Sequence, residues 1–305
     1  MKKLLVLLLS CIATTAFAQI NTSDSTVQVI SYWNLGETQS YAISLQKIQM
    51  TGDDTTKNET MTYDVDIKVL DSTENSYVIE WYYHNYQSNS TNEIEKKAIS
   101  VAENLKVEIE TDEYGAIRGV RNWEEVSAYI KKGIAQITSN YEMSPQKQEL
   151  LAQTELKYTT KEAIESNGID DVLQFHLFHG IKYQKGEVLE VPLKLANNYN
   201  PNKPFDVKST TSLEEIYPED AYYILKCTQE VDSKQLANAT YEYLKSMYKT
   251  IGWQKIKKRE ISRLSNVTQT VSGIHNTGWV LYSINTVTVE AQGIKDIEKR
   301  TIELQ

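Results

Sequence analysis

The sequence predicts an α+β protein built on a strongly curved antiparallel β-sheet, in the form of a split or half barrel. Apolar and β-branched residues alternate with polar ones over long stretches of the first and last thirds of the chain, which is the period of a half-buried strand. Residues 122–180 and 234–251 instead place apolar residues at the helical period. Short polar turns separate the strands, as between antiparallel neighbours. We expect the helices to pack on the concave side of the sheet.

The first 18 residues, MKKLLVLLLSCIATTAFA, have the anatomy of a secretory signal peptide, with two lysines, a short apolar run and Ala-Phe-Ala before Gln19. The apolar run is shorter than the about 20 residues that a membrane-spanning helix needs. Leu8-Leu9-Ser10-Cys11 also resembles a lipoprotein signal, in which Cys11 carries a lipid anchor. We favour cleavage after Ala18, and expect an exported protein of the periplasm or cell surface with no transmembrane segment.

The N-terminal β-rich half, residues 19–121, contains six predicted strands, at residues 27–33, 39–49, 60–70, 76–87, 106–111 and 116–121. The last two are joined by Asp112–Gly115, where glycine suits a turn with positive φ. The most aromatic stretch is SYVIEWYYHNYQ, residues 76–87. Strand alternation sends two sets of its side chains to opposite faces: a core or ligand-facing set of Tyr77, Ile79, Trp81 and Tyr83, and a mixed set of Val78, Glu80, Tyr82, His84 and Tyr86.

A helical insert follows over residues 122–180. Asn122 with Glu125 predicts a capping box, and Ser144-Pro145 predicts a second helix with proline in its first turn. Thr159 with Glu162 predicts the start of a third helix that ends at Gly168. A fourth is expected from Asp170-Asp171 to Gly180.

The C-terminal β-rich half, residues 181–305, repeats the pattern. Strands are predicted at residues 188–195, 205–216, 222–231, 261–273, 279–291 and 297–304, with one amphipathic helix over 234–251. Pro192 favours an edge position for the first of these strands. Each half also has a turn ending in glycine before an apolar strand, in EYGAIRGV and NTGWVLYS. This leaves open a fold of two similar halves.

Composition excludes some classes of partner. The chain has 32 basic and 41 acidic side chains, for a net charge of −9, and residues 1–18 hold two of the lysines and no acid. Nucleic-acid binding needs clustered cations, and the only dense cluster, Lys255–Arg259, is typical of a solvated segment. Beyond Cys11 the single cysteine is Cys227. It rules out an internal disulfide, and its apolar surroundings predict a buried thiol.

Two histidines are the best metal candidates. His176 and His179 lie one turn apart on the fourth predicted helix, after Asp170 and Asp171, and imidazoles spaced in this way bind zinc when a third ligand comes from elsewhere. His176 also falls on the apolar stripe of that helix, as a core histidine would. No cofactor signature and no serine or cysteine catalytic motif accompanies them, so we expect no cofactor.

Three short stretches, Asp24-Ser25-Thr26, Asp54-Thr55-Thr56 and Asp71-Ser72-Thr73, resemble an O-glycosylation signal of exported Gram-negative proteins. All lie in predicted turns or near the mature N-terminus, within reach of a transferase. Ser25, Thr55 and Ser72 are the candidate acceptors.

Four longer stretches carry a resemblance: WNLGETQSYAISLQKIQ, TYDVDIKVLDSTENSYVIEWYY, ETDEYGAIRGVRNWEE and NTGWVLYSINTVTVEAQG. The chain resembles uncharacterised exported bacterial proteins that are similar in layout to the half-barrel lipoprotein carriers and other lipid-binding envelope proteins. The resemblance implies a curved sheet wrapped around helices over an apolar cavity, and assigns no functional residue.

We therefore expect a non-catalytic exported protein that binds an apolar small molecule, a lipid or an envelope protein in the concavity of its sheet. Two alternatives stay open: a structural or interaction module with a filled core, and a metal-dependent hydrolase that uses His176 and His179.

Overall fold

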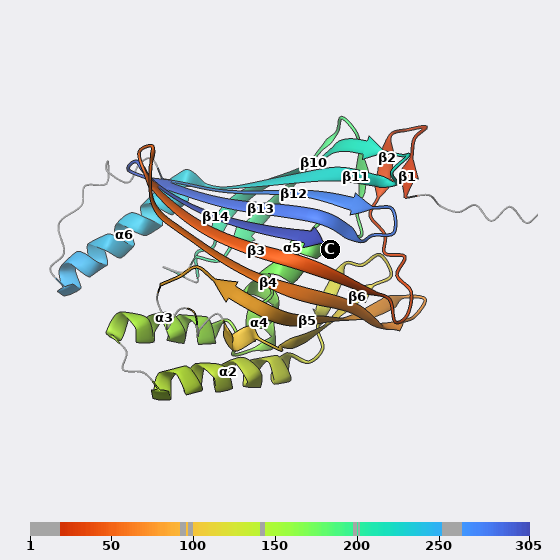
Figure 1. Ribbon diagram of the computed structural model, residues 1–305. Helices are drawn as coiled ribbons and strands as arrows, with labels where there is room; N and C mark the ends of the chain where they lie inside the picture. The colour runs from red at the N-terminus through yellow and green to blue at the C-terminus, as the bar shows by residue number, and fades with distance from the viewer. Residues whose placement is uncertain are drawn as a thin grey trace, which may run out of the picture.

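A computed structural model describes residues 19–91, 96, 100–140, 144–197, 200, 202–251 and 264–305. The signal peptide predicted at residues 1–18, with Cys11, and the Lys255–Arg259 cluster lie outside these residues. Eleven antiparallel strands form one open sheet, with β7 and β9 at its edges, so that the sheet is not closed into a barrel (Figure 1). In spatial order the strands are β7 (Ile117–Val120), β6 (Lys106–Asp112), β5 (Ser76–Ser88), β4 (Asp54–Ser72), β3 (Thr38–Thr51), β14 (Ile294–Leu304), β13 (Val280–Ala291), β12 (Ser265–His275), β11 (Tyr222–Val231), β10 (Phe205–Tyr217) and β9 (Val188–Leu195).

The predicted strands of both halves are confirmed within about two residues over most of the sheet. Strand β4 is longer than predicted at its start, β12 begins at Ser265 and β14 begins at Ile294. Strand β9 is an edge strand, as Pro192 predicted. The two halves belong to one continuous sheet because β3 pairs with β14. Strands β3 to β7 follow in chain order from this junction to one edge of the sheet. Strands β9 to β14 follow in chain order from the other edge back to the junction.

One face of this sheet carries the core. In an antiparallel sheet, directly opposed residues point to the same side. One such row runs across the middle of the sheet and defines what we call the inner face; its members are Tyr63, Ile43, Ile302, Ser283, Ser272 and Leu225. Helix α5 (Asp170–His176) lies on this face, since Gln174 Nε2 donates a hydrogen bond to Ser283 Oγ over 3.0 Å.

Four further helices and one 3-10 turn accompany the sheet in the described residues: η1 (Ser100–Ala102), α2 (Trp123–Asn140), α3 (Pro145–Leu156), α4 (Lys161–Asn167) and α6 (Ser233–Ile251). Helix α2 contacts β6, α4 contacts β7, and α6 contacts β10 and β12 at the other side of the molecule (Figure 1). The predicted proline start of α3 and the stop of α4 at Gly168 are confirmed.

Three details of the helix ends differ from the prediction. Asn122 forms no capping box, because its Oδ1 accepts from the Glu108 amide at 2.9 Å and its Nδ2 donates to the Lys106 carbonyl at 3.0 Å. These bonds tie the start of α2 to β6. Thr160, and not Thr159, caps α4 by accepting from the Ala163 amide. Helix α5 ends at His176, four residues before Gly180.

The strand predicted over residues 27–33 is also wrong for most of its length. Strand β2 covers only Thr26–Gln28, in a small sheet with β1 (Ile20–Asn21) and β8 (Lys182–Gln184). Residues 29–33, which we call the strap, instead donate to turns of both halves. The Ser31 amide donates to the Tyr114 carbonyl at 3.2 Å, and the Tyr32 amide to the Thr277 carbonyl at 3.0 Å.

The two glycine turns noted in the sequence are the turns that receive the strap. Gly115 and Gly278 have φ of +91° and +83°, as a turn with positive φ requires. A Cβ on Gly115 would lie 2.0 Å from Ser31 Oγ, and a Cβ on Gly278 would lie 2.5 Å from the Ile30 carbonyl oxygen. Glycine is therefore needed at both positions for the turn and for the close approach of the strap.

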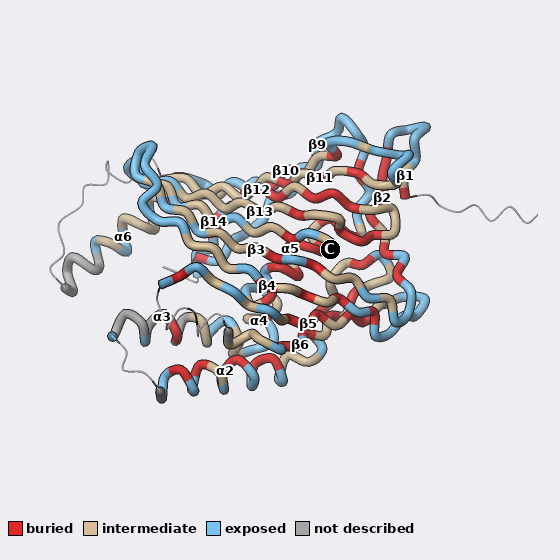
Figure 2. Tube along the Cα trace, in the orientation of Figure 1, coloured by how far each residue is buried: buried red, intermediate tan, exposed pale blue. Residues whose placement is uncertain are grey.

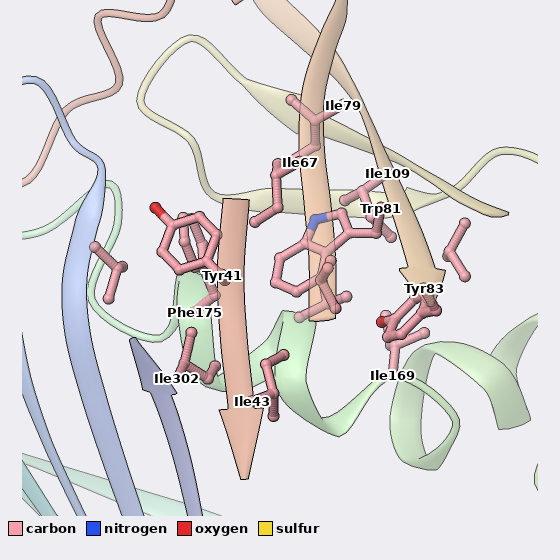
Figure 3. Packing of buried hydrophobic residues seen from close by; sticks show 14 of the residues in the cluster. Tyr41, Ile43, Ile67, Ile79, Trp81, Tyr83, Ile109, Ile169, Phe175 and Ile302 are labelled. Carbon is pink, nitrogen blue, oxygen red and sulfur yellow. The ribbon is translucent and has the colours of Figure 1, made fainter. Parts of the chain in front are cut away.

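The core is densest where the strands of the N-terminal half meet α5. Buried stretches gather on the strands away from the exposed β3–β4 and β13–β14 hairpins (Figure 2). Figure 3 shows Trp81, Tyr41 and Phe175 around the point of contact. The Phe175 ring meets those of Tyr41 and Trp81 edge to face, with centroids 5.6 and 5.4 Å apart. Such aromatic pairs add to the free energy gained from burial alone.

Strand β5 contains a bulge that the alternation did not predict. Asn85 has φ of +59°, and the pairing of β4 with β5 shifts register between Thr62 and Asp64. An extra residue in one strand reverses the side to which the following side chains point. Tyr86 therefore stacks on inner-face Tyr63, with centroids 4.7 Å apart, whereas strict alternation had placed it with His84 on the opposite face.

Candidate functional site

The described residues contain a pocket of about 520 Å³ between strands β3–β6 and helices α2 and α3. Its walls are mainly apolar. Helix α2 presents a stripe of three buried side chains, Val126, Ile130 and Ile134, and α3 adds Leu151. Leu45 and Met61 line the side formed by the sheet. This combination of an apolar wall and a concave shape is typical of sites for small apolar ligands.

One end of the pocket is polar and centres on Asp171. The Tyr63 hydroxyl donates to Asp171 Oδ2 at 3.2 Å, and the Tyr83 hydroxyl donates to Oδ1 at 3.1 Å. The Val172 amide also donates to Oδ1, at 3.0 Å. Asp171 is only 6% exposed, so three hydrogen bonds replace the water that a carboxylate would otherwise need.

Burial is the largest influence on the pKa values of the titratable groups at the polar end of the pocket. It raises the pKa of Asp171 above its ordinary value, although Arg300 and the Tyr83 hydrogen bond act in the opposite direction. Burial also raises the pKa of Tyr63 and Tyr83 well above 10, and that of Tyr158 to about 12. The phenols are therefore neutral hydrogen-bonding groups at any physiological pH.

Arg300 lines the same end from the central strand β14. Its side chain is 12% exposed. Its nearest acidic oxygens are Asp170 Oδ2 at 3.5 Å and Glu298 Oε1 at 3.7 Å, both from Nη2. Its Nε is buried and has no hydrogen-bond partner within the described part of the chain. A guanidinium offers five donors, and the one on Nε is available to a further acceptor.

Two lysine–glutamate ion pairs lie at the mouth of the pocket. Lys57 Nζ lies 2.8 Å from Glu59 Oε2, and Lys47 Nζ lies 3.7 Å from Glu298 Oε2. The same two lysines border a second hollow of about 410 Å³, which is walled by Val287, Val289 and Ile297 among others. The two hollows thus meet at a pair of lysines.

The four residues predicted to face a ligand occupy different positions. Tyr83 lines the pocket. Ile79 and Trp81 are fully buried in the core (Figure 3). Tyr77 is half-buried, donates its hydroxyl to the Ser31 carbonyl at 2.9 Å, and lies against Trp33 with centroids 5.3 Å apart.

The two candidate metal ligands, His176 and His179, lie side by side, and each forms a hydrogen bond with a backbone carbonyl. His176 Nδ1 donates to the Gly115 carbonyl at 2.7 Å, and His179 Nε2 donates to the Gly278 carbonyl at 2.9 Å. Each nitrogen must carry the proton, because a carbonyl oxygen can only accept. The ring centroids are 5.1 Å apart. Asp171, which the sequence placed beside them, binds the tyrosines instead.

The histidines are neutral in the folded protein. Burial lowers the pKa of His176 well below 6.5, and the neighbouring His179 adds to this effect. Burial also lowers the pKa of His179 to about 4. Within the described ranges, no group of three or more His, Cys, Asp and Glu side chains is placed to hold a metal ion. Cys227 is buried, as predicted.

The candidate glycosylation acceptors are accessible. Ser25, Thr55 and Ser72 are all exposed, and they lie respectively in a turn before β2, at the β3–β4 hairpin and at the end of β4. Ser25 lies in a turn, as predicted, whereas Thr55 and Ser72 lie within the two ends of strand β4 and not in the turns beside it.

Sequence reasoning missed Arg300, Tyr63 and Tyr86 as site residues. For Arg300 a signal was available: Ile302 and Leu304 alternate in the predicted last strand, which places Arg300 on the same face as these apolar residues. Glu298, on the same face of this strand, supplies one acidic partner of Arg300 at 3.7 Å, and Asp170 of α5 supplies the other at 3.5 Å. Tyr86 carried no such signal, because the bulge at Asn85 decides its side.

Comparison with known proteins adds no evidence for function, so function is inferred from the geometry of the site. No protein-family model matches the chain, and a search of curated proteins finds no match either. Within the described part of the chain, no helix has the length and apolar character needed to cross a membrane.

Proposed function

We propose that this protein is an exported, non-catalytic binding protein that holds an apolar ligand in the pocket beneath α2 and α3. The observation that carries the proposal is a concave volume of about 520 Å³ with apolar walls and one polar end. A buried apolar wall makes the transfer of an apolar molecule from water favourable by about 25 cal/mol for each Å² buried. The polar end supplies orientation and selectivity.

The proposed architecture is a curved half barrel whose helices lie on the concave side, similar in layout to the half-barrel lipoprotein carriers. Three observations support it: the long antiparallel sheet has free edges, α5 lies on its inner face, and the buried stripe of α2 lines the pocket. Export and the favoured cleavage after Ala18 rest on the composition of residues 1–18. Ser25, Thr55 and Ser72 are proposed acceptors of O-linked sugar, which an intact-mass measurement on the protein from its own host tests.

A neutral, environment-sensitive dye such as N-phenylnaphthylamine tests the ligand-binding proposal. We expect saturable binding to the native protein, with fluorescence that reports an apolar surrounding. Ile134→Trp fills the pocket from α2 and is expected to weaken dye binding about tenfold or more, because a well-packed wall accepts an added ring only at a cost.

Lys131→Trp is the matched control, since it adds the same ring to an exposed position of the same helix. Dye binding that is absent, or that is equal in the two variants, would contradict the proposal. It would favour the structural module with a filled core. Native mass spectrometry of the protein from its own host adds an independent result: a co-purifying lipid supports the proposal, and a co-purifying protein favours the envelope-partner alternative.

The hydrolase alternative makes a separate prediction. It requires the two histidines to bind zinc through the ring nitrogens that do not donate, His176 Nε2 and His179 Nδ1, which are buried without a hydrogen-bond partner among the described residues. Elemental analysis that finds no zinc, together with unchanged behaviour of the His176→Ala, His179→Ala double variant toward ester and peptide substrates, removes this alternative. Stoichiometric zinc in the native protein would revive it.

A further inference from the structure

Arg300 is a largely buried cation with one donor, Nε, that no hydrogen bond satisfies among the described residues. Its side chain is 12% exposed, yet it is involved only in ion pairs of 3.5 and 3.7 Å, both through Nη2. The Nε atom is buried without a partner among the described residues. A buried donor without an acceptor costs free energy in the folded protein, and a guanidinium is the side chain best suited to hold a planar or tetrahedral oxyanion through two hydrogen bonds.

The position of Arg300 couples it to the apolar pocket. On β14 it lies directly opposite Leu45 of β3, and Leu45 lies opposite Met61 of β4. All three side chains line the pocket. A group bound to Arg300 therefore continues into the apolar space that Met61 and the α2 stripe border. Such a site fits a molecule with a charged end and one apolar chain.

The charges of the lining single out Arg300 among its cations. Its cations are Lys47, Lys57 and Arg300, and its acids are Glu59, Asp170 and Asp171. Lys57 pairs with Glu59, and Lys47 pairs with Glu298, which leaves Arg300 as the cation beside the two aspartates. Burial raises the pKa of Asp171, which reduces the negative charge that competes for Arg300.

We propose that the ligand is a single-chain amphiphile with one terminal oxyanion, whose anionic end binds Arg300 and whose chain lies along α2. This inference rests on the proposed function, because it names the chemistry of the ligand in the same pocket. A free fatty acid and a lysophosphatidic acid share this chemistry. Arg300 acts as a specificity-determining residue: it selects the head of the ligand, and the pocket wall selects the chain.

The test compares dodecyl sulfonate with dodecanol, two probes of equal chain length of which only the first is ionised, in competition with the neutral dye. We expect the native protein to bind the sulfonate about tenfold or more tightly than the alcohol, since hydrogen bonds to charged groups are the strong ones. Arg300→Gln is expected to abolish this preference and to leave dodecanol and dye binding within about twofold of native. Arg300→Lys keeps a point charge without the paired donors, and is expected to retain part of the preference.

Arg118→Gln is the matched control, because Arg118 pairs with Glu113 on the surface, outside the residues that line the pocket. It should leave both affinities unchanged. Laurate and lauroyl lysophosphatidate, measured alongside, separate the two sources: the one that binds more tightly identifies the natural head, and both are expected to lose affinity in Arg300→Gln.

The outcomes distinguish this inference from the proposed function. Dye binding with equal affinity for sulfonate and alcohol in the native protein overturns the anionic head and leaves the apolar site standing. An equal loss of all probes in a folded Arg300→Gln variant, judged by circular dichroism, shows that Arg300 shapes the pocket and overturns its role in selection. Absence of dye binding in the native protein overturns both proposals.

Discussion

The inner face of the sheet is built from different residues on its two sides. On the N-terminal side it carries large rings and aliphatic chains, such as Trp81 and Tyr63, with α2 in contact with β6 and α4 with β7. On the C-terminal side, strands β12 and β13 contribute short polar side chains. Ser272 donates to Ser283 over 2.8 Å, and Asn285 donates to Thr270 over 2.8 Å.

The difference shows two ways in which the inner face of the sheet is buried. Short hydroxyl and amide side chains are buried at little cost when they hydrogen-bond to one another across neighbouring strands. Large rings stabilise the fold through the area they bury, and the pocket lies on this side, between strands β3–β6 and helices α2 and α3. We therefore expect the N-terminal side to carry ligand binding and most of the packing energy, and the C-terminal side to tolerate the loss of volume better than the loss of a hydrogen bond.

The largest effect is expected on the aromatic side. Trp81→Ala removes a fully buried ring that packs on Phe175, and should lower the free energy of unfolding by about 3 to 5 kcal/mol, measured by urea denaturation. Glu80→Ala is the control on the opposite face of the same strand, where an ion pair with Lys106 contributes less than about 1 kcal/mol. Similar losses in the two variants would show that the ring is not part of a packed core.

The second effect concerns the histidine pair that links the two sides, because His176 binds a turn of one half and His179 a turn of the other. His179 has a pKa of about 4 in the folded protein, against about 6.5 in the unfolded chain. The folded state therefore binds the proton less well. The stabilisation from neutral His179 is complete above pH 6.5 and is lost as the pH falls toward and through 4, by about 3 kcal/mol.

His179→Gln tests this sign, since its amide Nε2 can still donate to the Gly278 carbonyl but does not titrate. We expect the variant to lose less of its free energy of unfolding than the native protein between pH 6.5 and 4, in urea denaturation at each pH. Equal pH dependence of the two proteins would mean that His179 takes up its proton without disturbing the turn, and would contradict the linkage.

The smallest effect is expected on the polar side. Ser283→Ala leaves Gln174 Nε2 and the Ser272 hydroxyl without their shared acceptor, and should cost about 1 to 3 kcal/mol in the free energy of unfolding. Thr286→Ala, on the other face of the same strand, is the control. If Ser283→Ala is as harmless as the control, the two sides do not differ in the way described. A loss as large as that of Trp81→Ala would contradict the comparison as well.

Periodicity predicted most of the strands and helices because each has one buried face, which leaves a mark in the sequence. It failed where the conformation of a segment depends on a partner outside that segment. The bulge at Asn85 depends on the register of β4, and the strap depends on turns more than 80 residues away from it along the chain. The pocket was unpredictable for the same reason: Asp171, Tyr63 and Arg300 come from α5, β4 and β14, and only the sheet order together with the packing of α5 on the sheet brings them together.

The place of the last strand at the centre of the sheet affects how the chain folds. Leu304 pairs with Tyr41, so the eleven strands become continuous only when nearly the whole chain is available. Contacts between such distant residues are slow to form, since a long loop must close before they stabilise anything. Until then β3 and β13 each present an unpaired edge, which is prone to wrong pairing. We therefore expect the two halves of the sheet to join late in folding, when β14 pairs with β3.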